Sequence, residues 1–66
     1  MKLEEKKEVE EKLRAGYRTK VAALVRGGWW ISRDTMTFLA AAGIRDAMYK
    51  AGANASIKII KYTHHN

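Results

Sequence analysis

The segment best suited to chemistry is Arg26-Gly27-Gly28-Trp29-Trp30-Ile31-Ser32-Arg33, in which two tryptophans lie between arginines beside a glycine pair. An aromatic ring can stack on a base while a guanidinium binds phosphate, so this spacing is typical of a nucleic-acid contact surface. The competing interpretation is structural, because each Trp has a large apolar area that a small protein buries in its core or in a dimer contact. The tripeptide Arg-Gly-Gly alone discriminates little between the nucleic-acid interpretation and the structural one.

The other basic residues extend the nucleic-acid hypothesis. In residues 1–12, four Lys and five Glu nearly cancel, whereas residues 13–66 contain nine Lys and Arg against only Asp34 and Asp46, a net charge of +7. Such a surplus favours an anionic partner, either nucleic acid or an acidic protein surface. The candidate nucleic-acid or anion-binding residues are Arg18, Arg26, Trp29, Trp30, Arg33, Lys58 and Lys61.

Residues for catalysis or metal binding are scarce. The chain has no Cys, and its two histidines, His64 and His65, are adjacent at the C-terminus, where neighbouring side chains point to opposite sides of a strand. Asp34 and Asp46 are the only acids after residue 12, and both are explained as charges on a helix. We therefore expect no enzyme activity, no catalytic residue, no cofactor and no metal site.

Membrane insertion and secretion are not expected. The N-terminus is a run of charged residues without the apolar stretch of a signal peptide. The longest uncharged stretch runs from Thr35 to Ile44, ten residues, whereas a spanning helix needs about 20. The sequence predicts a cytoplasmic protein.

A first helix is expected over residues 3–26. Val9, Leu13, Tyr17, Val21 and Val25 recur at every fourth position, which is the spacing of an amphipathic helix, and the glycine pair after residue 26 is a stop signal. The first turns have little apolar surface, so residues 1–12 are expected to form a charged helical extension. Residues 13–66 would then form a single compact basic domain.

A second helix is expected over residues 33–51, with Ser32 as its N-cap and Gly52 after its C-terminus. Apolar residues occupy two sides of this helix, which predicts packing on both sides. Small residues at Gly43 and Ala47, in line with Leu39, would permit close contact with another helix.

The C-terminal residues 55–63 are rich in β-branched and aromatic side chains and are expected to form a strand. Its partner is either a short parallel strand over residues 29–31, reached through the second helix, or the same strand of a second copy. The expected fold class is α+β, rich in α, with strand pairing completed in a homodimer or larger closed oligomer. The candidate interface residues are Leu39, Gly43, Ala47, Ile57, Ile59 and Ile60.

The small size of the chain also supports the expectation of a homodimer or larger oligomer. A domain of 66 residues buries only about 60% of the surface that its unfolded chain exposes, so self-association is a plausible source of stability. The leading functional prediction is a small, basic, non-enzymatic module that binds nucleic acid through a basic surface and the Trp/Arg turn. The alternative is a small inhibitor or adaptor that blocks a surface of a larger protein complex.

Overall fold

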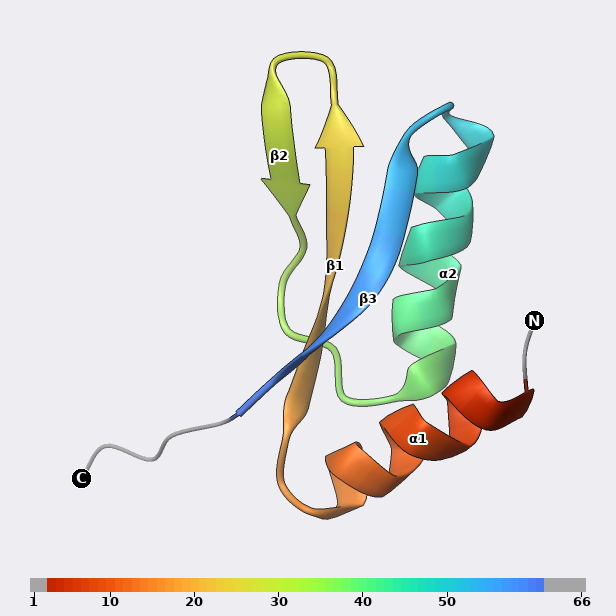
Figure 1. The fold of residues 1–66 in the computed structure, drawn as a ribbon, viewed down its shortest axis with the longest axis vertical. Coiled ribbons are helices and arrows are strands. Elements are labelled where there is room, and N and C mark those ends of the chain that lie inside the picture. The colour runs from red at the N-terminus through yellow and green to blue at the C-terminus, as the bar shows by residue number, and fades with distance from the viewer. Residues whose placement is uncertain (1–2, 62–66) are drawn as a thin grey trace.

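A computed structural model describes residues 3–61 of the chain, and these residues form two helices and one antiparallel sheet (Figure 1). The elements in chain order are α1 (Leu3–Arg14), β1 (Arg18–Val25), β2 (Gly28–Ile31), α2 (Phe38–Lys50) and β3 (Asn54–Ile60). The α+β class is confirmed. No helix within the described residues is long and apolar enough to cross a bilayer.

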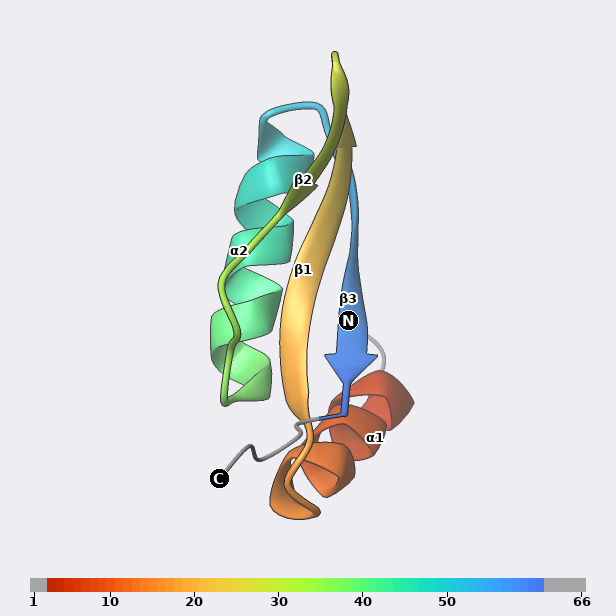
Figure 2. The ribbon, with the colours of Figure 1, turned by 90° about the vertical axis from the view of Figure 1, so that its left-hand side faces the viewer.

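The central strand of the sheet is β1. The strand order is β2-β1-β3, and β1 pairs antiparallel with both neighbours. Seen nearly edge-on, the sheet has α2 on one side (Figure 2). The strands β2 and β3 therefore run in the same direction on either side of β1, joined through α2.

The predicted helix over residues 3–26 is wrong after Arg14. Gly16 has φ 100°, a left-handed conformation that ends α1, and residues 18–25 then continue as a strand. The four-residue spacing that suggested a helix is an even number, so Val21 and Val25 also lie on one face of a strand. The two polar residues just before Val21 follow the same alternation, with Thr19 turned inward and Lys20 turned outward.

The glycine pair forms a hairpin turn. Val25 pairs with Gly28, so Arg26 and Gly27 are the two residues of the loop, and Gly27 has φ 102°. Two-residue hairpin loops require positive φ, which glycine adopts without a steric penalty. The stop signal was therefore correctly placed, but it ends a strand and reverses the chain into β2.

The second helix begins five residues later than predicted, because the residues before it extend the sheet. Ser32 does not cap the helix: its hydroxyl accepts from the Val21 backbone N–H at 2.8 Å, while its own N–H donates to the Val21 carbonyl. Thr35 and Thr19 exchange backbone hydrogen bonds and are joined by their buried hydroxyls. The N-cap is Thr37, whose hydroxyl accepts from the Ala40 N–H at 3.1 Å.

The C-terminal strand is present, and so is the short strand over residues 29–31, but their pairing differs from the prediction. The strand β3 pairs with β1 over its whole length, from Asn54 opposite Leu24 to Ile60 opposite Arg18. Neither a neighbouring parallel strand nor a second copy is needed to pair it. The strand ends at Ile60, and the predicted end at residue 63 lies outside the described residues.

The core lies between the sheet and the helices in two adjoining clusters. Under α2, the small residues Ala23, Ala41 and Ala55 surround Val21 and allow a close approach of helix and sheet. Where α1 meets the start of α2, Val9 packs with Phe38 and Ala42, each at most 3% exposed. An ion pair between Arg45 and Glu5 at 2.8 Å joins the same two helices. The extension expected at residues 1–12 thus contributes Val9 and Glu5 to these helix contacts.

Candidate functional site: the open face of the sheet

Within residues 3–61, one face of the sheet carries no helix at its centre. Val21, Ala23 and Ala55 point toward α2, so the alternate residues of each strand point to the opposite side. We call this surface the open face. By the strand register it comprises Arg18, Lys20, Ala22 and Leu24 of β1, Trp29 and Ile31 of β2, and Asn54, Ser56, Lys58 and Ile60 of β3.

The half of the open face nearest the hairpin is apolar and accessible to solvent. Trp29 lies directly opposite Leu24 in the register, and Ile31 lies opposite Ala22. Trp29 is 65% exposed, Ile31 53% and Leu24 50%. Large apolar side chains that gather on one exposed surface are typical of a site that binds another molecule.

The other half of the open face is basic. Lys20 and Lys58 lie directly opposite each other, and Arg18 is two residues before Lys20 on the same face of β1. Side chains in directly opposed positions are about 5 Å apart at Cβ, and like charges there destabilise a sheet. A bound anion between the two ammonium groups would remove that repulsion.

Asp34 partly balances this charge. Its carboxylate lies 3.1 Å from the Lys20 ammonium, and both side chains remain accessible to solvent. An exposed ion pair contributes about 0–1 kcal/mol, so the Lys20 ammonium can exchange this partner for another anion at small cost. None of the open-face residues is acidic.

The guanidinium of Arg18 is directed back along the chain. Its Nη1 donates to the Tyr17 carbonyl at 3.1 Å and lies 3.4 Å from the Gly16 carbonyl. Arg18 therefore adds positive charge beside Lys20 while one of its donors is already used by the backbone.

The structure separates the two tryptophans. Because consecutive residues of a strand point to opposite faces, Trp29 belongs to the open face and Trp30 lies on the helix side, opposite Ala23 in the register. Trp30 is 40% exposed there. The two rings therefore do not lie on one surface where they could contact the same ligand. Trp29 is the tryptophan that shares the open face with its basic half.

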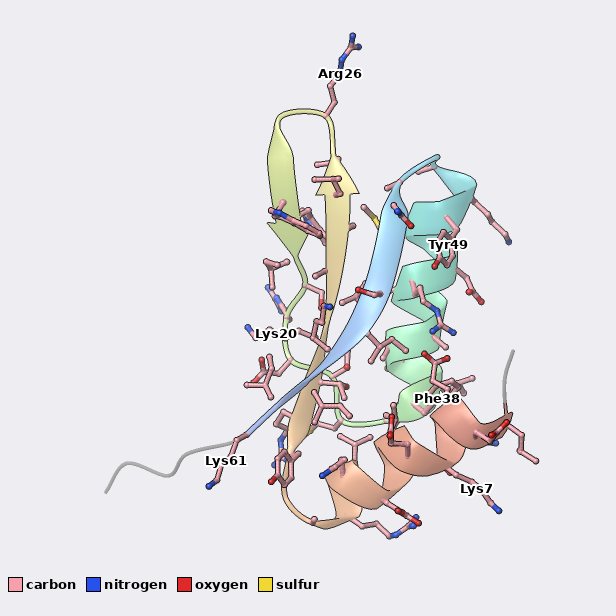
Figure 3. All side chains as sticks on the ribbon, in the orientation of Figure 1. Lys7, Lys20, Arg26, Phe38, Tyr49 and Lys61 are labelled. Carbon is pink, nitrogen blue, oxygen red and sulfur yellow. The ribbon has the colours of Figure 1, made fainter. Side chains whose placement is uncertain are left out.

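The remaining predicted nucleic-acid residues lie around the open face. Figure 3 shows Arg26 at the tip of the hairpin and Lys61 at the other end of the sheet. Arg33 is exposed in the segment that follows β2, and Lys61 is exposed directly after β3. These three residues are spread over the rim, whereas Arg18, Trp29 and Lys58 share the face itself.

Lys20 is the basic residue of the open face that was not among the predicted site residues. Its position two residues after Arg18 is the signal, because that spacing places both bases on one face of a strand. In a helix, residues two positions apart lie on different sides. The prediction of a helix over residues 3–26 therefore did not place Arg18 and Lys20 on one face.

The predicted interface residues do not form one surface. Leu39 (80% exposed), Gly43 and Ala47 lie on the outer side of α2, where nothing lies within 4 Å of the position of a Gly43 Cβ. Ile57 and Ile59 are half-buried beneath the helices, and Ile60 belongs to the open face. Only one side of α2 therefore packs within the chain, through Phe38, Ala41, Ala42, Ile44 and Met48.

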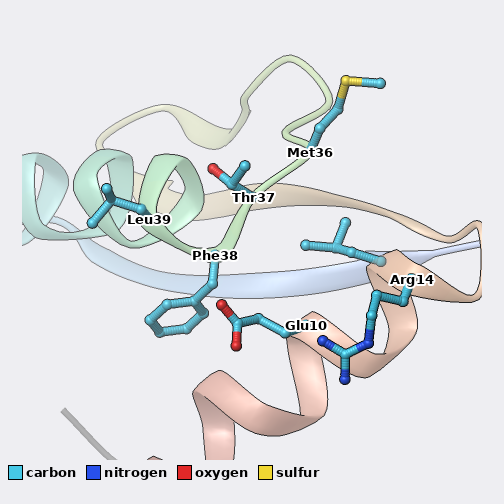
Figure 4. Close-up of a pocket in the computed structure, with 7 residues that line it drawn as sticks. Glu10, Arg14, Met36, Thr37, Phe38 and Leu39 are labelled. Carbon is cyan, nitrogen blue, oxygen red and sulfur yellow. The ribbon is translucent and has the colours of Figure 1, made fainter.

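A separate hollow lies between α1 and the start of α2 (Figure 4). It has a volume of about 300 Å³ and is lined by Glu10, Leu13, Arg14, Met36, Thr37, Phe38 and Leu39. Glu10 is its one carboxylate, and the Thr37 hydroxyl is occupied in capping α2. No group of three or more His, Cys, Asp or Glu side chains that could hold a metal occurs within residues 3–61.

The chain finds no match among models of known protein families, among curated proteins or among solved structures. A functional conclusion therefore depends on the chemistry of the open face.

Proposed function

We propose that the protein is a non-enzymatic nucleic-acid-binding module that uses the open face of its sheet. The observation that carries the proposal is the joint placement of an exposed aromatic ring, Trp29, and a directly opposed lysine pair, Lys20 and Lys58, on one surface whose nearest acid is Asp34, the exposed partner of Lys20. Aromatic rings that stack on bases, combined with positive charge along the backbone, are the usual means of binding exposed bases. The setting of this activity is the cytoplasm.

The charge of the molecule supports the proposal. The net charge is +6, and five of the seven acids lie in α1, between Glu4 and Glu11, rather than on the sheet. The other two are Asp34, which pairs with Lys20, and Asp46, on α2. A polyanion would therefore meet its most favourable potential at the sheet.

The test of this proposal is the salt dependence of binding to mixed-sequence oligonucleotides. We expect retention at low salt and a fall in the logarithm of the association constant with the logarithm of salt concentration, with a slope of about −0.7 per phosphate contacted on a single strand. A slope near zero, or no retention of DNA or RNA at low salt, would contradict the proposal.

The second candidate function is a small inhibitor or adaptor that covers an acidic surface of a larger protein. The observation that favours it is the exposure of Leu24, Trp29 and Ile31 side by side, which would suit the apolar centre of a protein interface. A saturable protein partner whose binding survives nuclease treatment and is lost on substitution of Trp29 would support this alternative over the first.

We also propose that the protein self-associates, with a dimer favoured, through the outer side of α2. Leu39 projects there beside Gly43 and Ala47, and small residues allow two helices to approach closely. Sedimentation equilibrium at high micromolar concentration is expected to give twice the 7.5 kDa chain mass, and Leu39→Glu is expected to return it to the chain mass. A wild-type mass of one chain would reject self-association.

A further inference from the structure

We infer that the ligand of the open face is a single-stranded nucleic acid, with one base stacked on Trp29 and a phosphate between Lys20 and Lys58. This inference rests on the proposed function, and it names the substrate class that the open face fits.

The stacking position follows from the exposure and setting of Trp29. The ring stands on the open face opposite Leu24, with Ile31 on the same strand two residues away, and 65% of the residue is accessible. In a duplex both faces of a base are already covered by its neighbours, whereas a base of a single strand can leave its stack and lie on an aromatic side chain.

The phosphate position follows from the register. Lys20 and Lys58 are a like-charged pair in directly opposed positions, and Arg18 adds a third positive charge on the same face of β1. The repulsion between opposed like charges is a cost that the free protein bears and that a bridging phosphate would relieve. The Asp34 carboxylate at 3.1 Å offers Lys20 only an exposed partner, which a phosphate of the ligand can replace.

Small side chains lie between the two positions on β1 and β3, where Ala22 is directly opposite Ser56. Ile31 of β2 flanks Ala22 on its other side. Trp29 pairs with Leu24, four residues along β1 from Lys20, which corresponds to about 14 Å of strand. This separation requires a ligand of several linked nucleotides rather than a single one.

The helices offer no competing surface for a duplex. Readout of the major groove is commonly performed by an exposed helix with polar and basic side chains. The outer side of α2 instead presents Leu39, Gly43 and Ala47, and α1 exposes a series of glutamates. The open face combines an exposed tryptophan with three basic residues, and it is the surface that a splayed single strand can follow.

The experiment uses Trp29 as the reporter. In a Trp30→Phe variant Trp29 is the only tryptophan, and its fluorescence is followed while the full chain is titrated with an oligothymidylate and, separately, with a duplex of mixed sequence. We expect the single strand to quench Trp29 and to bind roughly tenfold or more tightly than the duplex. A Trp29→Leu variant is expected to lose roughly tenfold in single-strand affinity, because a base–aromatic stack is removed, with its salt slope unchanged.

The outcomes separate this inference from the proposed function. Equal or tighter binding of the duplex, or binding of the single strand without a change in Trp29 emission, would overturn the single-strand inference while leaving a nucleic-acid module. Failure of both probes to bind at low salt would overturn the proposed function itself. If circular dichroism shows that Trp30→Phe does not fold, a comparison of single-strand affinity between the wild type and Trp29→Leu replaces it. A loss smaller than twofold in Trp29→Leu would then reject the stacking position.

Discussion

Reversal of both lysines on the open face, in a Lys20→Glu/Lys58→Glu variant, is expected to lower the affinity for a single-stranded oligonucleotide by roughly a hundredfold. Each substitution removes a charge-assisted contact with phosphate and replaces it with repulsion. The two positions remain a like-charged pair, and the change also replaces the exposed Lys20–Asp34 ion pair with repulsion, which adds a local cost of about 1 kcal/mol. Affinity is measured by fluorescence anisotropy of a labelled oligonucleotide at about 0.15 M salt, where the Debye length is about 8 Å.

The control for this variant has the same net charge. Lys7→Glu/Lys50→Glu also lowers the charge from +6 to +2, but Lys7 lies on α1 and Lys50 at the end of α2, both away from the open face. We expect its affinity to stay within about threefold of the wild type, because distant exposed charges are largely screened. Equal losses in both variants would show that total charge, rather than the open face, determines binding. Circular dichroism of each variant establishes that it is folded.

The second large effect, a loss of folding stability, is expected from substitution of Phe38, where α2 begins and α1 packs against it (Figure 3). Phe38 is 3% exposed and contacts both Val9 and Ala42 in the smaller core cluster. Phe→Ala substitutions in a core cost about 3–5 kcal/mol, whereas a domain of this size has a free energy of unfolding of only about 3–10 kcal/mol. Phe38→Ala is therefore expected to lose about a third or more of its free energy of unfolding, measured by urea denaturation followed by circular dichroism.

The neighbouring residue supplies the control. Leu39 begins the same helix turn but is 80% exposed, so Leu39→Ala, compared at a protein concentration too low for self-association, is expected to change the free energy of unfolding by no more than about 0.5 kcal/mol. Similar destabilisation by the two substitutions would mean that α1 and α2 do not meet at Phe38 as described.

The class of the fold could be predicted from the sequence, but the central strand could not. Val21 and Val25 fit a helix and a strand equally well, because a spacing of four residues is even. The hairpin that decides between the two depends on pairing of Val25 with Gly28 across the turn, a contact between strands that local periodicity does not report. Tertiary pairing therefore replaced the last part of the expected first helix with β1.

The start of α2 shows the same limitation. Ser32 has the chemistry of an N-cap, yet its hydroxyl satisfies the Val21 N–H across the sheet. Thr37 has the same chemistry five residues later and performs the capping. The position of the cap depends on how many residues the sheet pairs before the helix begins, which the sequence pattern does not show.

The candidate site was predicted in its residue types rather than in its geometry. Trp29 and Lys58 were recognised as an aromatic and a base, but only the register brings them to one face and turns Trp30 to the other. Lys20 gains its importance from Lys58, which lies 38 positions later in the chain and directly opposite it in the sheet. Such a relation between distant residues is visible only once the strands are paired.

The most direct test of the open face is a map of amide and indole chemical shifts during titration of the labelled full chain with a single-stranded oligonucleotide at low salt. The account predicts that the largest changes fall on Lys20, Ala22, Ser56, Lys58 and the Trp29 indole N–H, with smaller changes at the Trp30 indole. Changes concentrated on Leu39, Gly43 and Ala47 of α2, with the open face unaffected, would contradict it.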